Sequence, residues 1–154
     1  MLRAGSRRSR PGSTFESLRL ISEPAEGQSA LPFARVGGEA QVRRLVDRFY
    51  DLMDLDPTCR ELRALHPELL HGSRDKLFWY LCGWLGGPQH YTERFGHPML
   101  RARHLPSSIG VRERDQWMLC MRSAMQEVQI DVQLAQQLEE SFFKTADWMR
   151  NRGV

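Results

Sequence analysis

Apolar residues recur at intervals of three and four positions along most of the chain beyond residue 36, a pattern typical of amphipathic helices. The first such stretch has its apolar positions within residues 42–53, and we expect this helix to end at about Leu55. Asp56-Pro57 then predicts a short second helix, because aspartate caps a helix N-terminus and proline fits the first turn. This short helix should end ahead of Pro67.

Helix-breaking residues divide the middle of the chain. Ser73 is expected to cap a helix that stops at Gly86-Gly87-Pro88, since glycine and proline both oppose helix propagation. Residues 90–98, which are rich in His, Tyr and Phe, are interpreted as a loop. This loop leads to a short apolar and basic segment, residues 99–105, which Pro106 closes.

Two longer helices are predicted further on, with apolar positions at helical spacing within residues 117–128 and 132–149, and Asp131 is the expected cap of the second. No segment alternates with a period of two and β-branched enrichment, so an all-α fold is predicted. Residues 1–35 contain scattered proline, glycine and serine and only a short apolar patch. We therefore expect a flexible, Arg-rich N-terminal extension, followed by one domain over residues 36–154.

Charge is distributed unevenly between these two parts. The chain carries 22 basic and 19 acidic side chains, but six of the basic and three of the acidic ones fall in residues 1–35. The remainder is balanced at sixteen of each, which argues against a nucleic-acid-binding surface on the folded part. No apolar run approaches the roughly 18 residues that cross a bilayer. Three cysteines without a CxxC spacing are expected to be reduced thiols in a cytoplasmic protein.

Among the residue types that can ligate metals or take part in catalysis, histidine is the most unevenly distributed. All five histidines fall in one stretch, at positions 66, 71, 90, 97 and 104, but no HExxH spacing indicates a zinc enzyme. His104 lies on the short segment between Pro98 and Pro106, where a constrained backbone can direct one ring nitrogen inward as a metal ligand. Arg101 and Arg103 flank it; each either pairs with an anionic group of a cofactor or is a surface solubiliser.

Tyr50 and Trp117 lie on apolar helix faces but carry an O–H and an N–H, groups that usually find partners when buried. They are either donors to a ligand or ordinary core aromatics. Without further information, a cofactor-free helical interaction module, in which the His and Trp residues are ordinary packing residues, would be the leading interpretation. Such a module would be colourless when purified.

Three separated motifs give a more specific indication. WLGGPQHYTERFGHPMLRARHLP (residues 84–106), preceded by RFYDLM (residues 48–53) and followed by ERDQWMLCM (residues 113–121), resembles the group II truncated haemoglobins. The resemblance covers residues 36–150. It implies a truncated globin-like two-over-two helical sandwich that holds one non-covalent haem b, an iron protoporphyrin IX.

The resemblance also implies site residues. His104 matches the family's proximal iron ligand, and the distal ligand-binding side is implied to comprise Phe49, Tyr50, His66, Ser73, Leu77 and Trp117. The other implied haem-binding residues are Lys76, Leu81, Tyr91 and Arg103, with Leu77 and Trp117 also touching the cofactor. One position departs from the family: Ser107 stands where members commonly carry phenylalanine, which implies looser packing beneath the haem.

The implied function is binding of diatomic gases, O2 and also NO or CO, at a five-coordinate iron. Tyr50, Trp117 and His66 are implied to donate to bound oxygen, and two such hydrogen bonds would slow its release roughly a hundredfold or more. Such slow release favours a protein that captures oxygen over one that delivers it in oxygen transport. An enzymatic alternative is a peroxidase-like or NO-detoxifying dioxygenase activity, which would need an external reductase because the chain has no flavin or nicotinamide domain. A monomer and a homodimer are both compatible with the sequence.

Overall fold

The computed structural model describes residues 30–153, and this part of the chain contains helices and no strand, as the all-α prediction requires. Residues 1–29, most of the expected extension, lie outside the described residues. None of the described helices has both the length and the apolarity that a bilayer-spanning segment needs. In chain order the helices are α2 (Pro32–Val36), α3 (Gly38–Leu55), the 3-10 helix η1 (Pro57–Cys59), α4 (Arg60–Ala64), α5 (His71–Trp84), α6 (His90–Phe95), α7 (Leu100–His104), α8 (Val111–Glu127) and α9 (Val132–Trp148).

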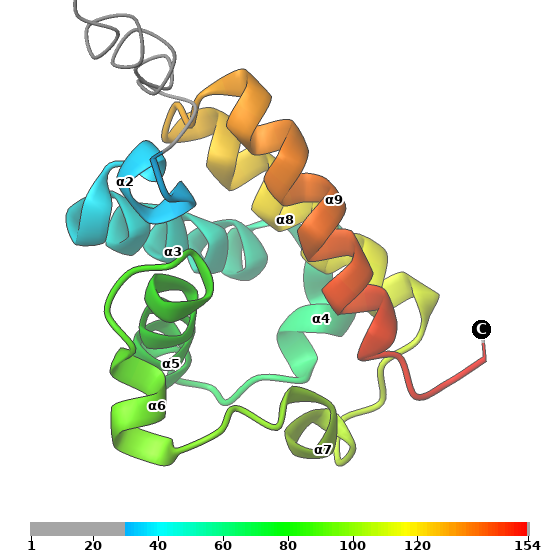
Figure 1. Ribbon diagram of the computed structural model, residues 1–154. Helices are drawn as coiled ribbons and strands as arrows, with labels where there is room; N and C mark the ends of the chain where they lie inside the picture. The colour runs from blue at the N-terminus through cyan, green and yellow to red at the C-terminus, as the bar shows by residue number, and fades with distance from the viewer. Residues whose placement is uncertain (1–29, 154) are drawn as a thin grey trace, which may run out of the picture. The chain divides into compact units, whose positions relative to one another are not determined.

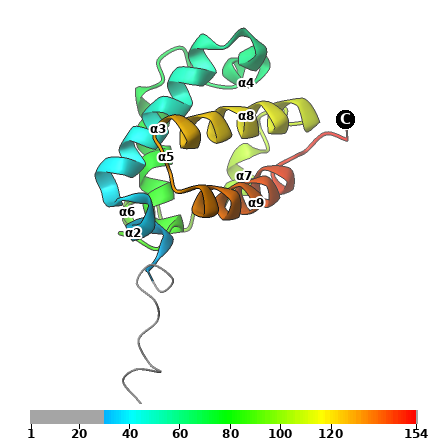
Figure 2. The same ribbon diagram turned by 90° about the horizontal axis from the view of Figure 1, so that it is seen from above.

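Four long helices make up the frame of the domain. α3 packs against both α5 and α8, and α8 packs against α9 (Figure 1). Viewed from above, α8 and α9 run side by side as one pair (Figure 2). The apolar faces of the four helices meet in one core, at whose centre Phe49, Leu45 and Met121 are fully buried. This arrangement confirms the predicted two-over-two helical sandwich.

Several helix boundaries follow the predicted local chemistry. α3 ends at Leu55, and Asp56 caps η1 by accepting a 2.9 Å hydrogen bond from the Thr58 N–H. Asp131 caps α9 in the same way, accepting from the Leu134 N–H at 3.1 Å. These polar side chains satisfy amide donors that have no partner within the first helical turn.

The prediction for Ser73 as a helix cap is wrong. α5 begins at His71, so Ser73 lies inside its first turn, and Leu70 occupies the cap position without a side-chain bond. The backbone itself starts the helix, because the Arg74 N–H already donates to the Leu70 carbonyl at 2.8 Å. Ser73 is therefore free to face the interior of the molecule from a helical position.

The prediction that residues 90–98 form a loop is also wrong in part, because His90–Phe95 is the helix α6. Its two aromatic residues, Tyr91 and Phe95, lie one turn apart with ring centroids 4.9 Å from each other. Both pack onto α5, where Tyr80 and Trp79 lie 6.2 and 6.0 Å away respectively. Aromatic packing against a neighbouring helix stabilises a turn whose sequence alone resembles a loop.

The folded part begins earlier than the predicted boundary at residue 36. α2 already belongs to it: the Phe33 N–H donates to the Leu85 carbonyl at 2.9 Å. A Cβ at Gly87 would lie only 2.5 Å from the Phe33 ring, so this position requires glycine. Local composition cannot reveal such a contact, because its partners are more than fifty residues apart in the chain.

Candidate functional site

A cavity of about 650 Å³ opens between the four long helices and the short helices α4, α6 and α7. Its volume falls in the range of about 300 to 1,000 Å³ that is typical of cofactor and ligand sites. The predicted site residues that line it are Tyr50, His66, Ser73, Lys76, Leu77, Leu81, Tyr91, Arg103, His104 and Trp117. The fold thus brings together side chains that are spread over almost seventy positions of sequence.

Phe49 is the one predicted site residue that does not line the cavity. It is fully buried, with its ring centroid 5.0 Å from that of Tyr50 and 5.1 Å from that of Trp117. Phe49, which was expected beside the pocket on the distal side, thus lies behind the two polar aromatics and supports their orientation.

Tyr50 presents an uncharged hydroxyl to the cavity from α3. Only 5% of its surface is exposed, and burial raises the pKa of Tyr50 well above its usual value, with Arg74 opposing this weakly. The phenol therefore stays protonated and can donate. Within residues 30–153 its hydroxyl has no protein hydrogen-bond partner and opens onto the cavity.

Trp117 faces the same cavity from α8. Its indole is wedged between Phe49 and Phe142, whose ring centroids lie 5.1 and 5.5 Å away. In the described part of the chain its N–H also lacks a protein acceptor. Tyr50 and Trp117 thus offer two immobilised donors to whatever occupies the cavity. We call the wall that carries Tyr50, His66, Ser73, Leu77 and Trp117 the distal wall.

His66 completes this wall from the segment that follows α4. Its Nδ1 lies 2.9 Å from the Leu62 carbonyl, and its ring centroid is 5.8 Å from that of Tyr50. Burial lowers the pKa of His66, with the Leu62 hydrogen bond opposing and the nearby Arg63 charge adding to the effect. The ring is therefore neutral, and the bond to Leu62 assigns the proton to Nδ1, leaving Nε2 as an acceptor.

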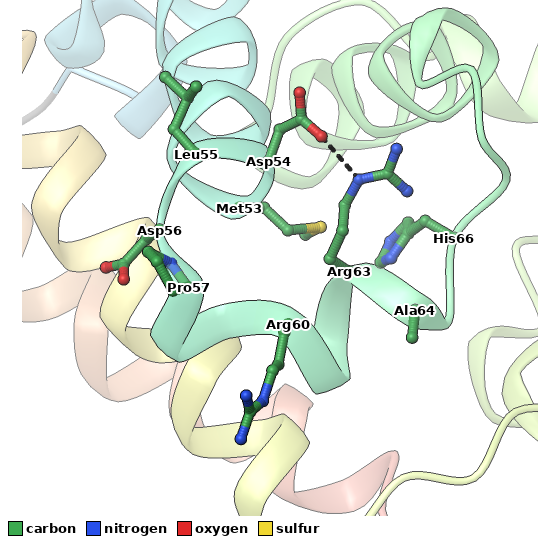
Figure 3. Close-up of a pocket in the computed structure, with 9 residues that line it drawn as sticks. All are labelled: Met53, Asp54, Leu55, Asp56, Pro57, Arg60, Arg63, Ala64 and His66. Atoms are coloured by element: carbon green, nitrogen blue, oxygen red, sulfur yellow. Dashed lines mark hydrogen bonds and ion pairs between the residues drawn. The ribbon is translucent and has the colours of Figure 1, made fainter.

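Arg63 holds the His66 segment in place. It pairs with Asp54 of α3 at 2.9 Å (Figure 3). It also donates to the carbonyls of Pro67 and Glu68 at 2.9 and 2.8 Å. These bonds connect the segment to the end of α3 on the outer side of the cavity. A second, outer pocket of about 360 Å³ lies there, and His66 lines both cavities.

The opposite side of the cavity, which we call the proximal wall, consists of α7 and its flanking residues. The Nδ1 of His104 lies 2.6 Å from the Leu100 carbonyl, so this nitrogen donates and Nε2 retains its lone pair. A histidine fixed in this way is typical of metal ligands, whose second nitrogen bonds a backbone carbonyl. His104 therefore has the chemistry that an iron ligand needs.

Hydrogen bonds with residues at the C-terminal end hold the proximal wall in place. The Asn151 side chain donates to the Ser107 carbonyl at 2.7 Å and accepts from the Ile109 N–H at 3.0 Å. Arg101 donates to the backbone carbonyls of Trp148 and Arg150 and does not line the cavity. Of the two arginines beside His104, only Arg103 lines the cavity and can contact a bound ligand.

Arg103 and Lys76 supply positive charge at the cavity lining. Within residues 30–153 neither has an acidic partner, in contrast to Arg114, which also lines the cavity but pairs with Asp147 at 2.7 Å. The Arg103 guanidinium lies 5.7 Å from the ring centroid of Tyr91. The side chains of Lys76 and Arg103, which have no acidic partner among residues 30–153, could pair with a ligand that carries carboxylates.

The remaining histidines do not contribute to the cavity lining. His90 instead pairs with Glu39 at 2.7 Å, and His71 and His97 also lie off the lining. Across residues 30–153 no three His, Cys, Asp or Glu side chains are grouped to hold a metal ion.

Further lining residues were not predicted as site residues. Phe142, Ala146 and Met149 on α9 lie at spacings of four and three, and the sequence assigned them only to an apolar helix face. Tyr80 on α5 lies three residues after Leu77, and burial raises its pKa. Helical periodicity identifies such faces but does not say which of them faces a cavity rather than the core.

A flat cofactor with its own iron and its own carboxylates would use the free His104 nitrogen, the two cations and the apolar walls together, and haem has this chemistry. A two-over-two helical sandwich around such a cavity defines the chain as a globin. The family model for bacterial-like globins matches residues 32–151, and the chain belongs to this family. Globins bind haem and, through it, diatomic gases.

Known relatives are similar to this chain over nearly the whole folded part. The chain is 38% identical over 115 residues to the group 2 truncated hemoglobin YjbI of Bacillus subtilis, covering 75% of this chain and 85% of that one. The group II 2-on-2 hemoglobin of Agrobacterium tumefaciens matches with a TM-score of 0.78 and 43% identity over 82% of this chain and 98% of that one. A truncated oxygen-avid haemoglobin of Bacillus subtilis matches with a TM-score of 0.73 and 36% identity, covering 79% and 100% of the two chains.

Proposed function

We propose that this globin binds haem b through His104 as its single protein ligand and releases O2 slowly. The observation that carries the proposal is a pair of donors, the hydroxyl of buried Tyr50 and the indole N–H of partly buried Trp117, which line the cavity without protein partners among residues 30–153. Both groups open onto the cavity, because among the described residues no fully enclosed side-chain nitrogen or oxygen lacks a hydrogen-bond partner. A polar ligand in the cavity would satisfy both.

Haem, when bound, supplies the iron at which diatomic gases are held reversibly. On the proximal wall His104 presents Nε2, and its hydrogen bond to Leu100 keeps the ring from rotating. Lys76 and Arg103 would pair with the two carboxylates of the cofactor, and Tyr91 would pack beside Arg103. The chain has no CxxCH sequence for covalent attachment, so these contacts would carry cofactor retention.

The distal wall sets the rate of gas release in this proposal. Each hydrogen bond to a partly charged ligand contributes about 1.5 to 2 kcal/mol. Two such bonds lower the free energy of the bound state by about 3 to 4 kcal/mol, which corresponds to roughly a hundredfold or more in the release rate. His66 is not counted among these donors, because its proton is on Nδ1 and is shared with the Leu62 carbonyl, which leaves Nε2 able only to accept. The printed description of the Bacillus subtilis structure as oxygen-avid is consistent with such a pocket.

Stopped-flow measurement of O2 dissociation tests the proposal. Tyr50→Phe removes one donor at nearly constant volume, and Trp117→Phe removes the other together with part of the indole ring; we expect each to speed release about tenfold or more. Trp79→Phe is the matched control, since Trp79 does not line the cavity and its loss should leave the rate unchanged. Equal dissociation rates in the unsubstituted protein and both donor variants would refute the proposal.

A further inference from the structure

Two cysteines lie in contact beneath the distal wall. The sulfur atoms of Cys59, in η1, and Cys120, in α8, are 3.2 Å apart, although the residues are 61 positions apart in sequence. Both side chains are almost fully buried, at 0% and 2% exposed. The third cysteine, Cys82 on α5, is equally buried but has no such sulfur neighbour within the described residues.

Both cysteines of the pair are free thiols. Burial raises the pKa of the Cys120 thiol, and the hydrogen bond with Cys59 raises it further. Cys59 can also donate to the Gln116 carbonyl, 3.9 Å from its sulfur. Because a disulfide needs its sulfurs about 2.05 Å apart, the two atoms must approach by roughly 1 Å for a bond to form. A shift of this size is within the reach of side-chain rotation and a small helix displacement.

We propose that Cys59 and Cys120 form a redox modification site, which a small two-electron oxidant of the peroxide class converts to an intramolecular disulfide. In the first step one sulfur attacks a peroxide oxygen, the O–O bond breaks, and a sulfenic acid and one water result. In the second step the other sulfur displaces that oxygen as a second water and forms the S–S bond. Two thiols and one hydrogen peroxide thus give one disulfide and two waters, with sulfur oxidised and peroxide reduced.

Burial determines which oxidants can react. A raised thiol pKa leaves little thiolate, so the reaction is slow, and the enclosed position favours small uncharged molecules over bulky disulfides. The neighbouring thiol also traps the sulfenic acid before it oxidises further, since the second sulfur is already in contact. Cys82 has no trapping partner and would not form a disulfide within the chain.

The disulfide would connect α8, which carries Trp117, to η1, which precedes the segment that carries His66. Trp117 lies one helical turn before Cys120 on α8, and Cys59 immediately precedes α4, which leads to His66. The same junction already holds the Leu62 N–H to the Gln116 side chain at 2.9 Å. We therefore infer that oxidation alters the O2 release rate, a consequence that rests on the proposed function, whereas disulfide formation itself does not.

Thiol counting on the full-length haem protein tests the site. The protein, held as its ferrous carbon monoxide complex, is exposed to hydrogen peroxide, quenched with catalase, denatured and alkylated with iodoacetamide for intact and peptide mass spectrometry. We expect alkylated thiols to fall from three to one, at Cys82, together with a peptide that joins Cys59 to Cys120. Oxidation of Met99, which is 58% exposed, reports that the peroxide dose was sufficient.

Variants distinguish the site from other thiol chemistry. Cys82→Ala should still form the disulfide, and Cys120→Ala should keep both remaining thiols alkylatable. Three alkylated thiols in the unsubstituted protein after complete Met99 oxidation would overturn the proposal, and so would a linked peptide that contains Cys82. If the disulfide forms but stopped-flow O2 release is the same before and after oxidation, the coupling to the distal wall is overturned and the modification site stands.

Discussion

On one side of the cavity Tyr50 and Trp117 stand on long helices packed into the core, whereas on the other side His104 stands on a helix of five residues that buries none of its side chains. The distal donors are fixed by apolar packing, with fully buried Phe49 behind both rings. The proximal ligand is fixed by hydrogen bonds to the backbone and to the C-terminal residues. Changes on the distal side should therefore weaken the whole fold, and changes on the proximal side should release the cofactor first.

The largest effect is expected from Phe49→Ala. Removing this ring leaves a cavity in the core and removes the support of both donors, which should lower the free energy of unfolding by about 3 to 5 kcal/mol. Denaturant titration measures the loss. Phe143→Ala, at a position that is 42% exposed, is the control and should change stability little. A loss below about 1 kcal/mol for Phe49→Ala would show that the distal wall does not depend on core packing.

Asn151→Ala should come next and act locally. It leaves the Ser107 carbonyl and the Ile109 N–H without their partner at the base of the proximal wall, at a cost of about 1 to 2 kcal/mol. We expect roughly tenfold faster haem transfer to an excess of apomyoglobin, with a smaller change in the denaturation midpoint. Asn151→Asp keeps the acceptor and loses the donor, so its haem transfer rate should lie between those of the unsubstituted protein and Asn151→Ala. An unchanged transfer rate in Asn151→Ala would show that the C-terminal residues do not hold the proximal wall.

Arg101→Ala removes a second tie between α7 and the end of α9. Because this side chain is exposed, we expect a smaller change, about two- to fivefold faster haem transfer in the same assay. Arg60→Ala is the matched control, since Arg60 is 82% exposed and lies away from the cavity. Equal effects of the two substitutions would mean that the Arg101 bonds do not hold the proximal wall.

The smallest effect is expected from Lys76→Ala and Arg103→Ala. Each removes one charge from the cavity lining, and partly exposed ion pairs contribute little in salt solution. Haem transfer should accelerate about twofold for each variant at low ionic strength and show no acceleration at high salt. A difference that persists at high salt would assign these side chains a packing role instead.

Sequence alone determined the helix boundaries that depend on local chemistry. Asp56 and Asp131 were correctly predicted as caps because a capping side chain bonds an amide two or three residues away. α6 could not be predicted in the same way, because Tyr91 and Phe95 pack against α5, a tertiary contact. The start of the folded part was missed for a similar reason: Phe33 is held by Leu85 and Gly87.

The site was predictable in its residues but not in its geometry. Motif resemblance selected side chains that the fold gathers around one cavity, but it could not show that Phe49 packs behind Tyr50 and Trp117 rather than on the lining. Nothing in the spacing of Cys59 and Cys120 indicates contact, and Asn151 belongs to no motif, because both contacts arise only when distant elements pack. Residue roles on both walls remain predictions for the measurements above.

The resonance Raman spectrum of the gas-free ferrous protein tests most directly whether His104 alone holds the iron. The unsubstituted protein should show a five-coordinate iron–histidine stretching band, and His104→Gly should lose it and recover a comparable band when imidazole is added. His97→Gly, outside the cavity lining, should keep the original band. Survival of that band in His104→Gly without imidazole would contradict the account.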